Sequence, residues 1–312
     1  MTPYPSDAVG VSRVAGRIDS VFLFIVVIAL IFFFLTQGTL IWFAWRYRRR
    51  KGNEGESTPY ITGNRLLETL WVVIPSALVL AIFAYGWIVF RDIRTAPAGA
   101  ADINVVARQW LYEFRYSDGR SSINEVRVPL GKPVRFVLTS SDVLHGFYLP
   151  AFRIKQDIVP GRYTDLWVQP EKAGSFDIYC TQYCGTGHST MRAKMIVMDA
   201  ADYRRWVAGE RKPDLAPPWM KGKGLVERYG CLGCHGVDGV DRIGPTFKGL
   251  YGRKVEMSDG SALIADESYF RESILDPTAK VVKGFDPVMP TYKGTLKEDE
   301  IAEIIAWLKT VK

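Results

Sequence analysis

The sequence predicts a multidomain protein in which a two-helix transmembrane hairpin precedes an all-β sandwich and an all-α domain. Three observations support this fold class: two long uncharged apolar segments, a middle region of short β-branched and aromatic runs, and a C-terminal third with helical periodicity. Of the 312 residues, 48% are hydrophobic and 23% are charged. This composition excludes a disordered or collagen-like chain, and the apolar segments argue against a soluble cytosolic enzyme.

Residues 1–95 are predicted to form an N-terminal segment and the hairpin. Residues 21–45 and 70–90 carry no Asp, Glu, Lys or Arg, and about 20 apolar residues cross the ~30 Å hydrocarbon core of a bilayer. A basic cluster at 46–51 follows the first span directly. Because basic residues in short loops stay in the cytoplasm, we expect the 46–69 loop to be cytoplasmic.

This orientation places the N-terminus and everything after residue 90 on the outer, periplasmic side of a bacterial cell membrane. The polar stretch before Val21 has no apolar core of its own, so we expect no ordinary cleaved signal peptide. A run of arginines can also bind nucleic acid. Between two spans, however, the run indicates topology, and we expect no nucleic-acid partner.

The outer part divides into two domains and a linker. Residues 96–209 contain short runs separated by Gly, Pro, Asp and Ser turns, which is typical of a β-sandwich. The predicted strands are 103–108, 134–139, 163–168 and 192–197. Residues 210–218 are polar and proline-rich and are predicted to be a linker. Residues 219–312 are predicted to form the all-α domain. Its terminal helix is predicted over 296–309, and one face of this helix is apolar: Ile301, Ile304, Ile305 and Leu308.

The all-α domain contains a motif for covalent haem attachment. Cys231, Cys234 and His235 form the pattern C-x-x-C-H. In this motif two thiols add to the haem vinyl groups and the histidine becomes an axial ligand of the iron. We therefore predict one covalently bound haem c. The alternatives are a redox dithiol or half of a zinc site, and neither is well served by one histidine without a second cysteine pair.

A low-spin electron carrier needs a second axial ligand, and methionine raises the reduction potential. Three methionines follow the linker: Met220, Met257 and Met289. We favour Met289 because a loop bounded by prolines presents its sulfur rigidly, just before the terminal helix.

A second cluster of soft ligands lies in the β-domain. The segment 180–191 contains Cys180, Cys184, His188 and Met191, and His145 lies upstream. Thiolate, imidazole and thioether groups favour copper. Two thiolates can bridge two copper ions, each capped by one histidine, so the set favours a dinuclear centre. A zinc site with two Cys and two His and a disulfide remain alternatives at this point.

This cluster and its surroundings resemble cytochrome c oxidase subunit II, the copper-bearing subunit of haem–copper oxidases. The similarity covers the loop 180–191, the run 140–145 (SSDVLH) and the order of two spans followed by an outer sandwich of cupredoxin fold. It extends to Pro150, Lys155, Asp157, Pro160 and Gly161. The resemblance implies that the dinuclear copper centre (CuA) is held by the side chains of His145, Cys180, Cys184, His188 and Met191 and by the backbone carbonyl of Gln182.

Gln182 departs from the family pattern, which has Glu at this position. The contact with copper is made through the backbone, so the resemblance implies that it survives. In the family the Glu side chain also touches a magnesium ion at the subunit interface, and the substitution puts that second site in question.

The haem motif extends the resemblance to caa-type oxidases, in which a cytochrome c domain is fused to the C-terminus of subunit II. The segment 244–253 (GPTFKGLYGR) is similar to the one that follows the haem motif in small soluble cytochromes c. In that family the proline packs beside the histidine ligand, and the preceding stretch supplies a carbonyl for its ring N–H.

Two further roles are implied by the resemblance. Trp110 begins an alternating aromatic run that ends at Tyr116, and the family places an electron-entry residue here, although Leu111 replaces one of the family's aromatics. Sandwich core is the simpler interpretation for the rest of the run. Glu68, at the inner edge of the second span, matches a glutamate that marks a proton-pathway entrance. The alternative is a local role, because the positive end of the helix dipole stabilises an acidic side chain at a helix start.

Together these features predict an electron-entry subunit of a respiratory terminal oxidase, an oxidoreductase complex. Electrons are expected to pass from haem c to the dinuclear copper and on to membrane subunit I, where O2 is reduced to water and protons are pumped. Subunit III and an upstream donor, either cytochrome c or a quinol:cytochrome c reductase, are the other expected partners. The chain carries no O2-reducing site of its own, because all three histidines lie outside the spans.

Two alternatives remain from the sequence. One is the electron-donor subunit of a related nitric oxide reductase, which would have the same cofactors and a different partner. The other is a membrane-anchored copper-delivery protein. A delivery site must release its metal, whereas His145 is distant in sequence and would close the site within a rigid fold.

Overall fold

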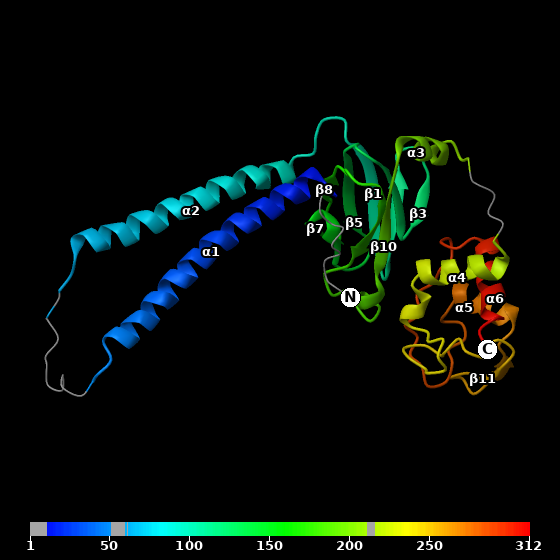
Figure 1. Cartoon of the computed structure of the whole chain (residues 1–312). Helices are drawn as coiled ribbons and strands as arrows, with labels where there is room; N and C mark the ends of the chain where they lie inside the picture. Colours follow the sequence, from blue (N-terminus) through cyan, green and yellow to red (C-terminus); the bar gives the residue numbers. More distant parts are fainter. Residues whose placement is uncertain (1–10, 51–59, 61, 211–215) are drawn as a thin grey trace.

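The computed structural model describes residues 11–50, 60, 62–210 and 216–312. In this part of the chain a helical hairpin, a two-sheet sandwich and a small helical domain follow one another (Figure 1). The predicted fold class is therefore confirmed. Parts of the predicted cytoplasmic loop (51–59 and 61) and of the predicted linker (211–215) lie outside the described residues, as do residues 1–10.

The hairpin consists of α1 (Arg13–Arg46) and α2 (Arg65–Arg94), both longer than the predicted spans. Each begins after a capping residue: the Ser12 hydroxyl accepts the N–H of Ala15, and the Asn64 side chain accepts two N–H groups at the start of α2. Both helices are long and apolar enough to cross a membrane. Their large apolar side chains are exposed, as expected of surfaces that face lipid or partner helices.

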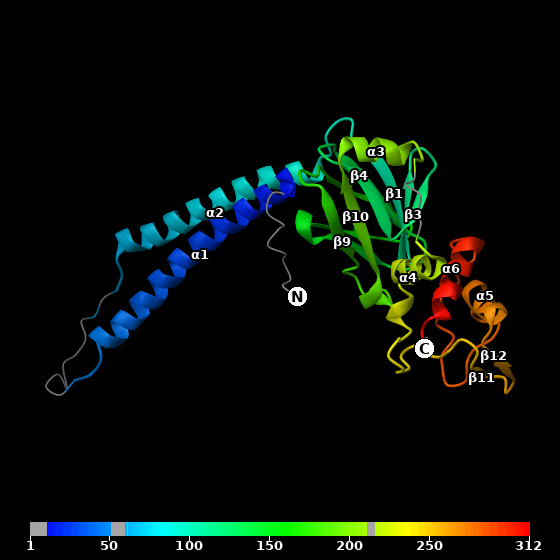
Figure 2. The same ribbon diagram turned by 45° about the vertical axis from the view of Figure 1, so that its right-hand side comes forward.

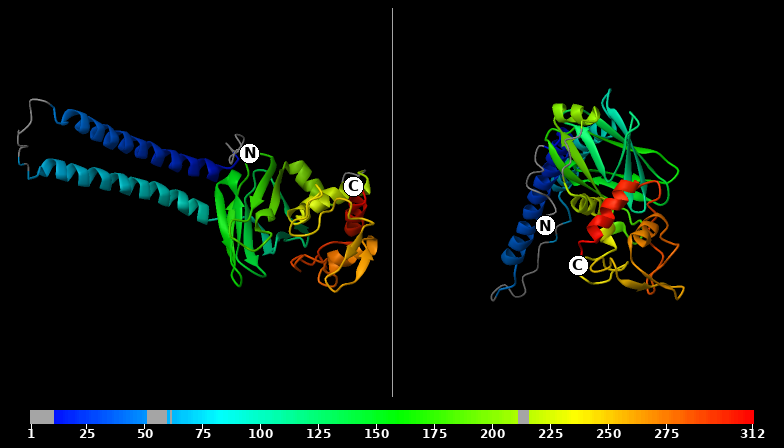
Figure 3. Two further views of the ribbon diagram at one scale, coloured as in Figure 1. Left: turned by 90° about the horizontal axis from the view of Figure 1, so that it is seen from below. Right: turned by 90° about the vertical axis from the view of Figure 1, so that its right-hand side faces the viewer.

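The outer ends of the hairpin are built into the sandwich. Val11 and Val14 are buried in the sandwich core, and the N–H of Glu171 donates to the Val11 carbonyl at 2.8 Å. At the end of α2 the Trp167 indole donates to the Asp92 carbonyl at 3.1 Å. The end of α1 and the start of α2 lie at the end of the hairpin that is far from the sandwich (Figure 3). The start of α1, the sandwich and the C-terminal domain therefore lie on the same side of the membrane that the hairpin would cross.

The sandwich is formed by two five-stranded sheets. The first has the order β3-β2-β1-β5-β8 and the second β4-β10-β9-β6-β7. The strands of the first sheet are β1 (Ala101–Arg108), β2 (Leu111–Tyr116), β3 (Ser121–Ile123), β5 (Val134–Ser140) and β8 (Thr164–Val168). Those of the second are β4 (Glu125–Pro129), β6 (His145–Leu149), β7 (Ile154–Ile158), β9 (Gly174–Tyr179) and β10 (Arg192–Met198). All four predicted strands are present.

Alternating side chains fill the space between the sheets. Along β2 the buried aromatics Tyr112, Phe114 and Tyr116 face the sandwich core, so the simpler interpretation of this aromatic run is confirmed for these three. Short helical turns, η2 (Pro150–Phe152) and η3 (His188–Thr190), and the helix α3 (Ala200–Val207) complete the domain.

The C-terminal domain contains α4 (Pro218–Arg228), η4 (Cys231–Gly233), α5 (Glu267–Leu275) and α6 (Glu298–Leu308). It also has a two-stranded sheet, β11 (Lys254–Glu256) and β12 (Ala262–Ile264), which was not predicted because three-residue strands leave no periodicity. The predicted apolar face of the terminal helix is buried. Figure 2 shows α4 at the end of the sandwich, with α6 next to α4 on the side away from the sandwich.

Candidate copper and haem sites

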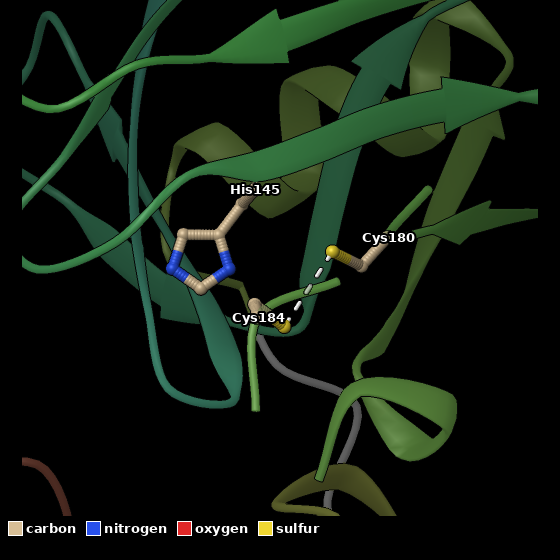
Figure 4. Close-up of side chains that lie close together, drawn as sticks. All are labelled: His145, Cys180 and Cys184. Carbon is tan, nitrogen blue, oxygen red and sulfur yellow. Dashed lines mark hydrogen bonds between the residues drawn. The ribbon is translucent and has the colours of Figure 1, made fainter. Parts of the chain in front are cut away.

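Three predicted copper ligands meet at one end of the sandwich. His145 begins β6, Cys180 directly follows β9, and Cys184 lies in the loop that leads to β10. All three are buried, and their donor atoms lie within 4.8 Å of one another. Figure 4 shows both thiols beside the imidazole ring of His145.

The other predicted ligands lie in the same group. The Cys184 sulfur is 3.5 Å from Nδ1 of His188 and 3.8 Å from the sulfur of Met191. The Cys180 sulfur is 3.2 Å from the carbonyl oxygen of Gln182. The fold thus brings the complete predicted ligand set together, although His145 is far from the loop in sequence.

The chemistry of this group fits metal ligation. The two sulfurs are 3.7 Å apart and both cysteines are free, so they form no disulfide, in which the sulfurs would lie about 2.05 Å apart. Nε2 of His145 lies 2.8 Å from the Asp142 carboxylate, whereas its Nδ1 is buried without a hydrogen-bond partner among the described residues. A buried unpaired ring nitrogen beside two thiols is what a bound soft metal would satisfy, with Asp142 orienting the ring.

Electrostatics favour a thiolate in this group. A hydrogen bond from the Cys184 thiol holds the pKa of Cys180 well below its usual range, against the opposing effect of burial. The backbone N–H of Gly146, 3.4 Å from the Cys180 sulfur, contributes to the lowered pKa. The same sharing raises the pKa of Cys184. The pair therefore releases its first proton readily, as a metal-binding thiol must.

Two features of the sandwich hold the copper loop in place. A Cβ on Gly146 would lie 2.7 Å from the backbone nitrogen of Thr181, so only glycine fits next to His145. The side-chain amide of Gln182 donates to the Asp157 carboxylate at 2.9 Å. The family has Glu at this position, whereas this chain has a neutral amide that is hydrogen-bonded to Asp157 of the same chain.

The haem motif opens into an apolar cavity of the C-terminal domain. The cavity is lined by Cys231, Cys234, His235 and Met289, together with aromatic and aliphatic side chains. Met220 is half exposed on α4 and Met257 is buried, and neither lines this cavity. Among the three candidate methionines, Met289 is therefore the one that shares a cavity with the histidine.

His235 is held in the form that iron ligation requires. Burial lowers its pKa, which favours the neutral imidazole, and its Nδ1 lies 2.8 Å from the Pro245 carbonyl. Nδ1 therefore carries the proton and Nε2 is left as the ligand atom. The carbonyl belongs to Pro245 itself, whereas the resemblance implied the stretch before it. The ring of Phe247, which the sequence did not single out, stacks on the imidazole at 4.4 Å.

The two predicted cofactor sites adjoin each other. Trp110 donates its indole N–H to the Cys184 carbonyl at 3.1 Å and also lines the haem cavity. A Cβ on Gly233, inside the haem motif, would lie only 2.4 Å from the methyl carbon of Thr190, inside the copper loop. The sequence provides no signal for this approach, because it joins two separate domains.

Glu68 lies at the other end of the molecule, near the start of α2. Its carboxylate accepts the backbone N–H of Asn64 at 3.2 Å and is exposed. This contact is the helix-start interaction expected of an acid at that position. The proton-entrance role stays a prediction.

Comparison with known proteins identifies the family. The model of the transmembrane domain of cytochrome c oxidase subunit II matches residues 8–88, that of its periplasmic domain matches 121–200, and the cytochrome c model matches 219–312. Cytochrome c oxidase subunit 2 of Alkalihalophilus pseudofirmus is 31% identical over 306 residues, covering 94% of this chain and 86% of the relative. The chain belongs to the cytochrome c oxidase subunit 2 family.

A second relative, the alternative cytochrome c oxidase subunit 2 of Bradyrhizobium diazoefficiens, is 32% identical over 57% of this chain and 76% of its own length. Among solved structures, the periplasmic domain of subunit II of cytochrome oxidase from Bradyrhizobium japonicum is 28% identical. The match covers 37% of this chain and 96% of that structure, with a TM-score of 0.36.

Membership in this family establishes the general role of the chain. The chain is a membrane subunit, with two spans, of a haem–copper terminal oxidase, an oxidoreductase in which subunit II is the point of electron entry. Its periplasmic-type domain implies CuA copper and its fused domain implies haem c. A catalytic partner subunit follows from the same assignment.

Proposed function

We propose that this chain takes electrons onto a covalently bound haem c and passes them through a dinuclear copper centre to the catalytic subunit, which reduces O2 to water and pumps protons. The observation that carries this proposal is the contact of Thr190 with Gly233, because it joins the copper loop directly to the haem motif. Two redox sites that touch across a domain boundary are suited to transfer within one chain.

The copper ligands in this proposal are the predicted ones: His145, Cys180, Cys184, His188 and Met191 through their side chains and Gln182 through its carbonyl. When bound, the copper pair would supply a one-electron carrier, and Cys180 and Cys184 would be the thiolates that hold it. The protein contributes a buried, preformed ligand group, with the His145 ring fixed by Asp142.

The haem is proposed to be attached through Cys231 and Cys234, with His235 and Met289 as the axial ligands of its iron. The Pro245 carbonyl and the Phe247 ring fix the orientation of the imidazole. The apolar side chains that line the cavity would exclude water from the bound haem, and a methionine ligand would raise its reduction potential.

Trp110 is proposed to assist electron entry into the copper site. It contacts the Cys184 carbonyl and lines the haem cavity, so it lies between the two cofactor sites. Glu68, near the other membrane surface, is proposed as the entrance of a proton pathway that continues in subunit I. Subunit III and a donor, cytochrome c or a quinol:cytochrome c reductase, complete the proposed assembly.

The proposed domain limits are those predicted from the sequence: 1–95, 96–209, 210–218 and 219–312. The proposed topology has the 46–69 loop in the cytoplasm and both cofactor domains in the periplasm. It is supported by the Arg-rich segment that follows α1 and by the docking of Val11 and Val14 on the sandwich, on the same side as the C-terminal domain.

The test is metal analysis combined with optical spectra of the detergent-solubilised chain, oxidised and then reduced. Two coppers for each haem, with a near-infrared copper–copper band that disappears on reduction, would support the proposal. The expected control is Gln182→Ala, which keeps both coppers because the carbonyl is unchanged. One zinc, or a haem spectrum without copper, would refute the copper assignment.

A further inference from the structure

The haem cavity is closed partly by the other domain. Leu111 begins β2 of the sandwich, yet its side chain is 5% exposed and belongs to the apolar cluster of the C-terminal domain. It lines the haem cavity together with Trp110 and Thr190. Because side chains alternate along a strand, Leu111 and its neighbour Tyr112 point to opposite sides: Tyr112 into the sandwich and Leu111 into the other domain.

Asn124 makes a second, polar connection. It is 5% exposed and has a φ of 52°, a conformation that asparagine tolerates. Its side-chain oxygen accepts the N–H of Tyr112 at 2.8 Å, and its amide donates to the carbonyl of Arg228 at 2.7 Å. Arg228 is the last residue of α4. The final carbonyls of a helix have no partner within the helix, so the sandwich caps a helix of the other domain.

Two further contacts surround this cap. The Arg228 guanidinium lies 3.7 Å from the carboxylate of Glu125, and Arg108 donates to the hydroxyl of Thr295. The contacts thus include an apolar insertion, a buried helix cap and charged groups at the edge, which is the composition of a specific interface.

We infer that Leu111 and Asn124 are positioning residues that lock the cytochrome c domain onto the cupredoxin domain, so that the haem pocket is a site shared by both. This inference rests on the proposed function only for its purpose, which is to hold the haem motif against the copper loop. The lock itself is a property of the polypeptide. Its loss leaves the cofactor ligands in place and separates the two domains.

The first test uses Asn124→Asp, which keeps the oxygen that accepts from Tyr112 and tolerates the same backbone conformation. The new carboxylate would face the Arg228 carbonyl without a proton to donate. We expect hydrogen–deuterium exchange in segments 225–235 and 108–112 of the full chain in detergent to become about tenfold faster or more. The matched control, Asn104→Asp at an exposed position of β1, should leave these segments unchanged. Unchanged exchange in Asn124→Asp would overturn the lock.

The second test uses Leu111→Asp, which would bury a charge in the apolar cluster, with Val207→Asp on the exposed face of α3 as its control. After an electron is photochemically injected at the haem, its passage to copper should slow by about tenfold or more, following the loss of the docked population. Copper and haem content should stay unchanged. Normal transfer in a chain with increased exchange would overturn the positioning role. Absence of copper or haem in the unmodified chain would refute the proposed function, whereas the exchange test would still decide the lock.

Discussion

Gly222 lies where α4 crosses α6, and its replacement by alanine tests how closely the helices of the haem-binding domain pack. A Cβ on Gly222 would lie 1.9 Å from the carbonyl oxygen of Glu303 and 2.5 Å from its carbonyl carbon. Both atoms belong to the backbone of α6, so no change of side-chain rotamer relieves the overlap. To restore an ordinary contact, the helices must separate by about 1.5 Å at the crossing.

The cost follows from what surrounds this crossing. Leu225 and Val226 of α4 are buried against the same cluster as Ile301 and Ile304 of α6, and a separation loosens these contacts. Overpacking a core costs about 1–3 kcal/mol when side chains can adjust. Because the obstacle is backbone, we expect Gly222→Ala to lower the free energy of unfolding of this domain by about 3 kcal/mol or more.

Gly224 provides the matched control. It lies in the same helix and is exposed, and nothing lies within 4 Å of a Cβ built on it. Gly224→Ala should therefore stabilise the domain by about 0.5–1 kcal/mol, because alanine loses less backbone entropy on folding. The same chemical change, two residues apart, has opposite expected signs.

The assay is urea unfolding of the detergent-solubilised full chain, followed through the absorption of the haem, with hydrogen exchange in α4 and α6 as a second probe. Ile304 and Leu308 also line the haem cavity, so Gly222→Ala should also change the haem absorption spectrum of the folded chain. If the free energies of unfolding of the two alanine variants agree within about 0.5 kcal/mol, the crossing accommodates a methyl group and the reasoning from close backbone packing is wrong.

Three other predictions concern the copper site and the hairpin. Gly146→Ala places a Cβ against the backbone nitrogen of Thr181, so metal analysis should show loss of copper with haem content unchanged; retained copper would mean that the loop adjusts. Gln182→Glu places a second carboxylate beside Asp157, and the resulting repulsion should lower the melting temperature at neutral pH while both coppers stay bound, with recovery as the pair is protonated in acid. Glu68→Gln keeps a side-chain oxygen for the N–H at the start of α2, so the chain's free energy of unfolding should change by less than about 0.5 kcal/mol. Proton uptake by the assembled oxidase should slow. Normal uptake would mean that Glu68 only caps the helix.

The sequence by itself determined the features that depend on local chemistry. The two spans follow from the transfer of uncharged segments into a bilayer, which depends on composition and length alone. The haem motif and the loop 180–191 are recognisable because their ligands lie close together in sequence. The aromatic run of β2 was predicted as sandwich core because the alternation of side chains between the two faces is a property of a single strand.

Only the tertiary structure decided the features that join distant segments. His145 enters the copper group because β6 and β9 are neighbours in one sheet, and its unpaired Nδ1 is visible only there. Met289 is distinguished from Met257 by the cavity that it lines.

Leu111 illustrates the limit of sequence-based reasoning. In the sequence it stands where the family has an aromatic residue, whereas in the structure it is the residue of β2 that the other domain buries. Likewise, Gly233 and Thr190 are ordinary residues of their own motifs until the domains meet. Contacts between domains depend on how two finished surfaces fit, and periodicity within either segment contains no record of that fit.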